Sequence, residues 1–488
     1  MFKRFMYMLA AASFILGGVA ARAQDAGALL DLLVRKKIIT DQEAEEVRAD
    51  LTKEAAATSA GKWKLSTPIT ELELYGDIRL RYEYRGGEDG GNVDHQHDWI
   101  ERERERYRLR LGLRGTLADD WFFGIRLETS ASNRSTNVTF GGDSNNGPFS
   151  KNDDGVFVGQ AYAGYKGFPD TTLTVGRMAN PIVTTPMVWD PDINPEGLAE
   201  QWKHTFTFNL GGAEGGPSYG KEGKGVVATQ EPVKLKLDLF ANFGQFVYDD
   251  SSPSNPLGPR KTSNGQLIPN TNAFLLAWQV GARLTLPKNI YFQAAPVLYN
   301  YTGNGKDFNT HFQGGDPNLT NAESLAQNQT GINSLLVLDV PMEIGWKIGE
   351  LPMRIFGDFA VNFEADDRAA AAGHPGKGDQ RYAYQIGLGV GQIKAKHDWE
   401  VDVWYQLSQQ YALDPNLVDD DIFDGHLNMH GIGANARYAL SDAVELRLGY
   451  NYGWRWDNSL GTGGTPIGIQ INPISRYQWF VADLNVKF

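Results

Sequence analysis

The sequence predicts an all-β fold, a transmembrane antiparallel β-barrel of about 16 strands that follows a short N-terminal periplasmic helical segment. Three observations support this. The N-terminus is basic, then apolar, and ends in an Ala-x-Ala motif, as in exported proteins. From residue 71 onward, apolar and polar residues alternate at period two in one segment after another. The last of these segments ends the chain at an aromatic residue, Phe488.

Residues 1–23 are predicted to be a secretory signal peptide. Lys3 and Arg4 precede an apolar run over 5–21, and Ala23 completes the cleavage motif. No later apolar run approaches the roughly 20 residues that a membrane-spanning helix needs. An exported chain without such a helix is either soluble or a β-barrel, whose strands hide their hydrophobicity in alternation. The absence of cysteine excludes a disulfide scaffold.

The charge of the chain argues against nucleic acid as a partner. The sequence has 46 basic and 59 acidic residues, which gives a net charge of −13. Removing Lys3, Arg4 and Arg22 with the signal peptide makes the mature chain more acidic still. A strongly acidic surface repels phosphate backbones. The 55 glycines and the aromatic content of 11% suit many strands and tight turns, although they would also fit a soluble β-sandwich.

Residues 24–61 are predicted to form a periplasmic helical segment and a linker. Leucines crowd its first part, and Thr40 with Glu43 forms a capping box that opens a second helix. This unit has too little apolar surface to fold alone, so we expect it to pack against copies of itself or against the barrel. The barrel is expected to occupy 62–488.

The first three strands place apolar residues on one face and charged residues on the other. In the first strand the two faces are Leu72, Leu74, Ile78, Leu80, Tyr82 and Tyr84 against Glu71, Glu73, Asp77, Arg79, Arg81 and Glu83. In the second they are Tyr107, Leu109, Leu111, Leu113 and Leu117 against Arg104, Arg106, Arg108, Arg110 and Arg114. A turn at 118–120 then leads to Trp121, Phe123, Ile125 and Leu127, with Arg126 on the polar face. A soluble sandwich rarely sustains alternation with so many inward charges.

Thirteen further strands are expected, and the even total is what a single-chain bacterial barrel requires. They fall near 156–167, 171–178, 202–210, 233–247, 273–286, 290–301, 334–348, 353–363, 380–393, 399–408, 426–439, 444–454 and 476–488. Short connections alternate with long polar ones, as expected for periplasmic turns and external loops. The long connection 211–232 breaks this alternation. The last strand must pair with the first, because lipid does not tolerate an open sheet edge.

The connection that follows the fifth strand carries the most distinctive motif. Residues 189–198 read Trp-Asp-Pro-Asp-Ile-Asn-Pro-Glu-Gly-Leu, after a strand that ends in Gly176-Arg177. With the terminal Phe488 and the Leu-rich N-terminal unit, the chain resembles the putative porins of Gram-negative bacteria and, more distantly, the phosphate-selective porins O and P. The resemblance covers nearly the whole mature chain. It implies a water-filled barrel, commonly a homotrimer, whose third loop, 179–201, folds into the pore.

The residues themselves also indicate a lumen, because about sixteen strands enclose an aqueous channel whose lining charges set its selectivity. A basic wall opposite an acidic loop would create a transverse field that passes small polar solutes. The alternative is that the arginines are solvated lumen residues, paired with Glu101, Glu103, Glu105 and Glu128. The candidate constriction residues are Arg79, Arg81, Arg104, Arg106, Arg108, Arg110, Arg114 and Arg126 on the strands, with Trp189, Asp190, Asp192 and Glu196 from the loop.

The function predicted is an outer-membrane porin that lets ions and small polar solutes diffuse passively. One alternative is a pore selective for phosphate, another anion or a sugar, although acidic residues close to the arginines weigh against phosphate. A second is a structural protein that tethers the cell wall, with residues 25–57 touching peptidoglycan. The expected partners are the lipid bilayer and lipopolysaccharide of the bacterial outer membrane, small hydrophilic solutes and two further copies of the chain.

An enzyme is not expected, and neither a cofactor nor a bound metal is predicted. The sequence has no Gly-x-Ser-x-Gly motif, and its eight histidines are scattered. His95 and His97 offer metal ligands, but in a loop that we expect to be solvated. Asp419, Asp420 and Asp421, with Asp424, resemble a calcium site in composition. Their spacing lacks the pattern of an EF-hand, so this too is interpreted as a solvated loop.

Overall fold

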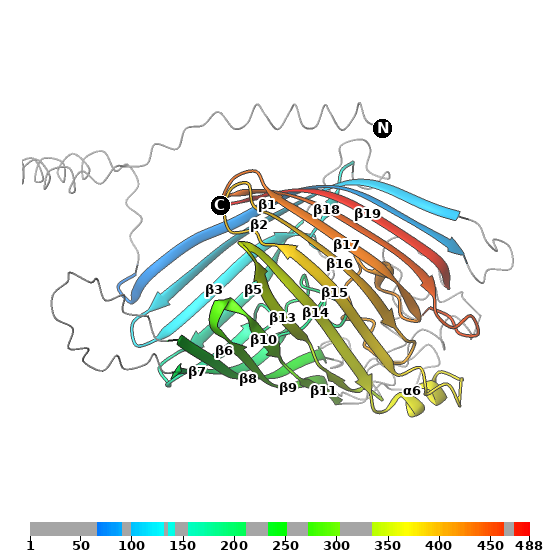
Figure 1. The fold of residues 1–488 in the computed structure, drawn as a ribbon, viewed down its shortest axis with the longest axis horizontal. Helices are drawn as coiled ribbons and strands as arrows, with labels where there is room; N and C mark the ends of the chain where they lie inside the picture. Colours follow the sequence, from blue (N-terminus) through cyan, green and yellow to red (C-terminus); the bar gives the residue numbers. More distant parts are fainter. Residues whose placement is uncertain are drawn as a thin grey trace, which may run out of the picture. The chain divides into compact units, whose positions relative to one another are not determined.

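The computed structural model describes residues 66–89, 99–130, 135–141, 155–210, 233–250, 272–302, 334–462 and 473–488. Pro68–Phe488 form one compact unit (Figure 1). The predicted signal peptide, the predicted helical segment, the 211–232 connection and the histidine pair of 90–98 lie outside the described residues.

The described strands form one closed antiparallel sheet of sixteen strands, as predicted. Two strands are interrupted, one into β10 and β11 and the other into β12 and β13, and β4 is a two-residue bridge against β2. The strands are β1 Ile69–Asp89, β2 Trp99–Leu117, β3 Trp121–Thr129, β4 Val138–Thr139, β5 Val156–Tyr165, β6 Thr171–Arg177, β7 Glu196–Leu210, β8 Val233–Asp250, β9 Asn272–Thr285, β10 Tyr291–Ala294, β11 Val297–Thr302, β12 Leu336–Asp339, β13 Met342–Ile348, β14 Leu351–Asn362, β15 Tyr382–Gly391, β16 Trp399–Ser408, β17 Met429–Ala439, β18 Val444–Arg455 and β19 Ile474–Lys487.

The helical elements are short. They are the 3₁₀ turns η2 (Pro287–Asn289) and η3 (Phe423–Gly425) and the helix α6 (Ala365–Ala371). Among the described residues, no helix is long and apolar enough to cross a membrane.

The barrel closes where the first strand meets the last. Strands β1 and β19, blue and red in Figure 1, pair from Asp77 opposite Lys487 to Glu88 opposite Arg476. Beyond that ladder, the backbones of Gly76 and Phe488 exchange hydrogen bonds of 2.9 and 3.0 Å. The predicted pairing of the terminal strands is therefore confirmed. No edge of this sheet is left to face lipid at the seam.

The two faces of the barrel wall have opposite chemistry. On β1, Leu74, Ile78 and Leu80 point outward and are exposed, whereas Arg81 and Glu83 point inward and are buried. The same inversion recurs around the sheet, with exposed Val175, Val280, Ile355, Ile386 and Leu448 on other strands. A protein folded in water buries such residues, so this band is suited to hydrocarbon. The alternation in the sequence thus encodes lipid outside and water inside.

A pair of glycines allows the chain to leave the wall between β6 and β7. Gly176 and Gly197 face each other across these strands, with φ of +120° and +152°. A Cβ atom at Gly176 would meet the carbonyl oxygen of Ala161 and the Cα of Tyr162, both of them backbone atoms that cannot move aside. Both the backbone conformation and the close approach therefore require glycine here.

We expect Gly176→Ala to destabilise the barrel by about 1–3 kcal/mol, because it adds steric collision to an unfavourable φ. The measurement is urea unfolding in lipid vesicles, followed by tryptophan fluorescence. Gly349→Ala is the matched control: Gly349 also has a positive φ, +61°, but a Cβ there would meet no atom within 4 Å. Equal losses of stability in the two variants would contradict the role assigned to the close approach.

Candidate functional site

The 178–195 loop, between β6 and β7, lies inside the barrel and is anchored to the wall. Gln279 of β9 accepts a hydrogen bond from the Val183 N–H at 2.9 Å and donates one to the Val183 carbonyl at 2.7 Å. The Thr185 hydroxyl donates to the carboxylate of Asp358 on β14. These lumen-facing side chains replace the partners that the loop's backbone would have in a sheet. At the other end of the loop, Asn194 accepts from Gln160 of β5 at 2.9 Å.

A second loop, 409–428, also fills part of the lumen, whereas the sequence predicted an external solvated loop. Its backbone joins the first loop directly: Asp190 N–H donates to the Leu417 carbonyl at 2.6 Å, and Asp419 N–H to the Pro186 carbonyl at 3.1 Å. Apolar side chains of both loops share one buried cluster, which includes Met187, Val188, Trp189, Leu413, Leu417 and Val418. The two loops therefore form a single structure across the lumen.

One signal for this second loop was present in the sequence. An external loop is usually polar, but this connection carries six large apolar residues, namely Leu413, Leu417, Val418, Ile422, Phe423 and Leu427. All six are buried in the structure. The helix α6 belongs to the preceding long connection, and its Ala365 and Ala369 share a buried cluster with Tyr411 of this loop.

Arginines of β1 hold the 409–428 loop in place. Arg85, 1% exposed, pairs with Asp424 at 2.5 Å and with Asp420 and Asp421 at 3.3 Å each. Arg81 pairs with Asp421 at 3.2 Å and with Asp483 of β19 at 2.7 Å. Sequence reasoning missed Arg85, because it ended the first strand before residue 85, whereas β1 continues to Asp89.

Three of the predicted constriction arginines are therefore neutralised inside the protein rather than presented to solutes. Besides Arg81, these are Arg104 and Arg106 of β2, which both pair with the buried Glu83, Arg106 at 3.2 Å. The predicted alternative was right that carboxylates compensate the arginines. Of the four glutamates that it named as partners, Glu128 pairs with an arginine, Arg126, at 2.7 Å.

The two loops also bring carboxylates together. Asp190 of the first loop and Asp419 and Asp420 of the second each place an oxygen within 4.8 Å of the others. Burial, and then the neighbouring carboxylates, raise the pKa of Asp190 and of Asp419 well above the usual range. Burial, partly offset by Arg85, raises the pKa of Asp420 to about 6.

Asp421, the next residue, has the opposite electrostatic environment. Burial opposes its ionisation, but Arg81, Arg85 and Arg447 outweigh burial and hold the pKa of Asp421 below its usual value. Arginines thus compensate the charge of some carboxylates in this run of residues, such as Asp421, and leave others, such as Asp419, uncompensated.

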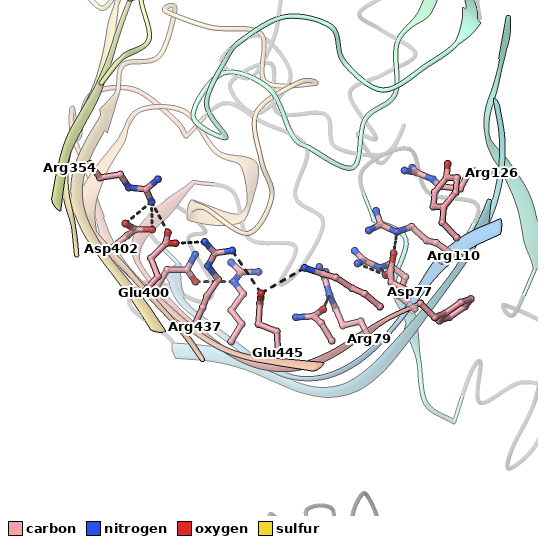
Figure 2. Close-up of a pocket in the computed structure, with 17 residues that line it drawn as sticks. Asp77, Arg79, Arg110, Arg126, Arg354, Glu400, Asp402, Arg437 and Glu445 are labelled. Atoms are coloured by element: carbon pink, nitrogen blue, oxygen red, sulfur yellow. Dashed lines mark hydrogen bonds and ion pairs between the residues drawn. The ribbon is translucent and has the colours of Figure 1, made fainter. Parts of the chain in front are cut away.

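Toward the short-turn end of the barrel the lumen opens into a cavity of about 650 Å³ (Figure 2). Eight basic side chains line it, against four acidic ones. Four of the basic residues were predicted to line the pore, namely Arg79, Arg108, Arg110 and Arg126. The other four, on strands that the prediction did not consider, are Arg354, Arg437, Arg447 and Lys487.

Figure 2 shows that both walls of the cavity carry both signs of charge. On one side, Arg354 donates to Asp402 and Glu400, at 2.7 and 2.8 Å for the closest atoms. On the other, Arg110 donates to Asp77 at 2.6 Å. The predicted transverse field, with a basic wall opposite an acidic loop, does not describe this cavity. Basic and acidic groups instead alternate around it, with an excess of basic ones.

The remaining predicted residues do not line this cavity. Arg114 pairs with Glu73, with both side chains about half exposed. The prediction placed Glu196 in the loop, but β7 begins at Glu196, which pairs with Arg177 at 3.0 Å. This difference arises because the strand extends six residues further than its clear alternation. Trp189 packs in the apolar cluster, with its ring centroid 6.2 Å from that of Phe246. Asp192 lies 3.9 Å from Arg108.

The profile of one protein family, described as Putative porin, matches residues 94–348, slightly more than half of the chain. The chain belongs to this family. The protein is thus a porin, which forms a channel in the bacterial outer membrane. None of the curated protein sequences matches this porin.

Several solved structures are similar to this porin. The Salmonella typhi OmpF complex with daunomycin has 9% identity and a TM-score of 0.41, with 86% of this chain and 97% of that chain covered. The outer membrane channel DcaP of Acinetobacter baumannii has 13% identity and a TM-score of 0.37, with 87% and 99% covered. A mutant of the Rh. blastica porin has 10% identity and a TM-score of 0.38, with 86% and 100% covered.

Proposed function

We propose that this porin passes small hydrophilic solutes by passive diffusion and favours anions among them. The observation that carries the proposal is the cavity with eight basic and four acidic side chains. In a narrow, water-filled lumen with low-dielectric walls, the excess charge of the lining raises the local concentration of ions of opposite sign. Among the selective pores considered from the sequence, for phosphate, another anion or a sugar, we therefore propose a pore that selects anions as a class.

Three basic groups of the cavity are held least tightly by their acidic partners. Arg79 lies 3.9 Å from Asp483, Arg447 3.5 Å from the same carboxylate, and Lys487 3.8 Å from Glu445. Shorter contacts, such as those of Arg110 and Arg354, leave less of the charge for a passing ion. We therefore assign the anion preference mainly to Arg79, Arg447 and Lys487.

A triple variant tests this assignment. In a planar bilayer under a potassium chloride gradient, we expect the reversal potential of the unmodified porin to indicate chloride preference. Replacing Arg79, Arg447 and Lys487 with glutamine removes three of the eight positive charges and should lower the chloride-to-potassium permeability ratio several-fold. Arg114→Gln, outside the cavity, is the matched control and should leave it unchanged. The proposal is wrong if the unmodified porin prefers potassium, or if the triple variant has the same chloride-to-potassium permeability ratio as the unmodified porin.

The remaining expectations from the sequence stand as proposals for the whole chain. We propose that residues 1–23 direct export, that 24–61 form a periplasmic segment able to reach peptidoglycan, and that the barrel sits in lipid and lipopolysaccharide as a homotrimer. No chemical reaction is proposed, because diffusion through a channel leaves the solute unchanged. Deleting 25–57 and measuring the mass of the oligomer tests the segment, and an unchanged trimer would exclude it as the trimerising element.

A further inference from the structure

Three carboxylates from two different loops converge at one point of the lumen. They are Asp190 on the 178–195 loop and Asp419 and Asp420 on the 409–428 loop, with one oxygen of each within 4.8 Å of the others. Calcium binds carboxylate oxygens at about 2.3–2.6 Å, so two ligands on opposite sides of the ion lie roughly 5 Å apart. The three oxygens thus lie within the span that the ligands of one calcium ion cover.

A second, independent observation is an unpartnered acceptor at this point. Asp190 is 2% exposed, and its Oδ2 has no hydrogen-bond partner among the described residues. Its other oxygen, Oδ1, accepts the backbone N–H of Asp192 at 2.8 Å. A buried acceptor without a donor costs about 1–3 kcal/mol, and more when it is charged. This oxygen is therefore open to a further donor or to a cation.

The basic residues nearby reach only one of the three carboxylates, Asp420. Arg85 contacts Asp420, Asp421 and Asp424, but no basic side chain of the described residues lies within 4.0 Å of Asp190 or Asp419. This contrasts with Asp421, which three arginines contact. Arginine from β1 thus neutralises one side of the 409–428 loop, and the side that faces the 178–195 loop has no such compensation.

We propose that Asp190, Asp419 and Asp420 bind one calcium ion, which joins the two loops across the lumen. The three ligands are carboxylate oxygens on loops of irregular backbone. They suit calcium, whose coordination is flexible, better than they suit magnesium, which requires near-ideal octahedral geometry. Water and backbone carbonyls would complete the shell. The site would fix the shape of the constriction, and it does not depend on the proposed anion preference.

Terbium, which replaces calcium and emits when a nearby tryptophan is excited, gives a direct test. The buried Trp189 is next in the chain to Asp190 and can serve as the donor. The full-length porin, refolded in detergent without lipopolysaccharide and treated with chelator, should bind one terbium ion per chain with saturable emission. Calcium should displace the terbium, and magnesium should do so at least tenfold less well.

Two isosteric variants locate the site. Asp190→Asn and Asp419→Asn should each weaken terbium binding at least tenfold, whereas Asp442→Asn, in an exposed turn, should leave it unchanged. Asparagine removes the negative charge but keeps the volume of the side chain. Heat-dependent migration in detergent gels shows whether each variant has folded. A folded parent that binds neither terbium nor calcium overturns the proposal whatever the variants do. Unchanged binding in both variants, or displacement by magnesium as readily as by calcium, overturns it too.

Discussion

Replacing Arg85 with alanine is expected to lower the free energy of unfolding by about 3–5 kcal/mol, the cost of leaving buried charges without their partner. The guanidinium is almost fully buried, and it contacts Asp424, Asp420, Asp421 and Glu83. Its removal leaves these carboxylates close together with less positive charge. We expect the 409–428 loop to leave its position first, so the single-channel current of this variant should become unsteady.

Urea unfolding in lipid vesicles measures the stability, and planar-bilayer recording measures the current. Arg114→Ala is the matched control, since it removes the same side chain from an ion pair with Glu73 that is about half exposed. Pairs of that kind contribute roughly 0–1 kcal/mol. The role assigned to Arg85 is wrong if both alanine variants unfold at the same urea concentration. Arg85→Lys should recover only part of the loss, because an ammonium cannot reproduce the fork of contacts.

Replacing Gln279 with alanine is expected to release the 178–195 loop from the wall. This fully buried side chain makes four hydrogen bonds, two to Val183, one to Ala295 and one to Asn242. Each buried group left without a partner costs about 1–3 kcal/mol. Because the loop narrows the lumen, we expect a higher mean conductance with frequent fluctuations between levels.

The matched control is Gln293→Ala, which removes the same side chain from β10. Gln293 accepts one hydrogen bond, from Arg283 at 3.3 Å, and the loop does not depend on it. Its channels should conduct as steadily as those of the parent. Steady conductance at the parent's level in Gln279→Ala would show that the loop holds its place without this anchor.

The fold was predictable because each residue of a strand faces either lipid or water. This requirement makes apolar and polar residues alternate at period two, and all sixteen strands could be located from that alternation. The alternation is weaker at strand ends, where both faces of the strand contact polar headgroups or water. The prediction therefore began β7 at residue 202, six residues late, and missed Arg85 at the end of β1.

The candidate site was less predictable, because alternation fixes a side chain's face and says nothing of its partner. Arg81 pairs with Asp483, 402 residues away, and Arg85 pairs with Asp424, 339 residues away. Such pairs follow from closure of the barrel and from the path of an inserted loop. The four basic residues of the later strands were not predicted, since none of them belongs to a series of alternating basic residues like the arginines of β2.

The seam between β1 and β19 has a consequence for how the protein acquires its structure. Asp77 pairs with Lys487. One edge of the first strand therefore stays unpaired until almost the last residue has been synthesised and exported. Contacts so distant in the chain form slowly. Arg81 contacts both Asp483 on the last strand and Asp421 on the 409–428 loop. The anchor of this loop on the wall is therefore complete only when the first and last strands have paired.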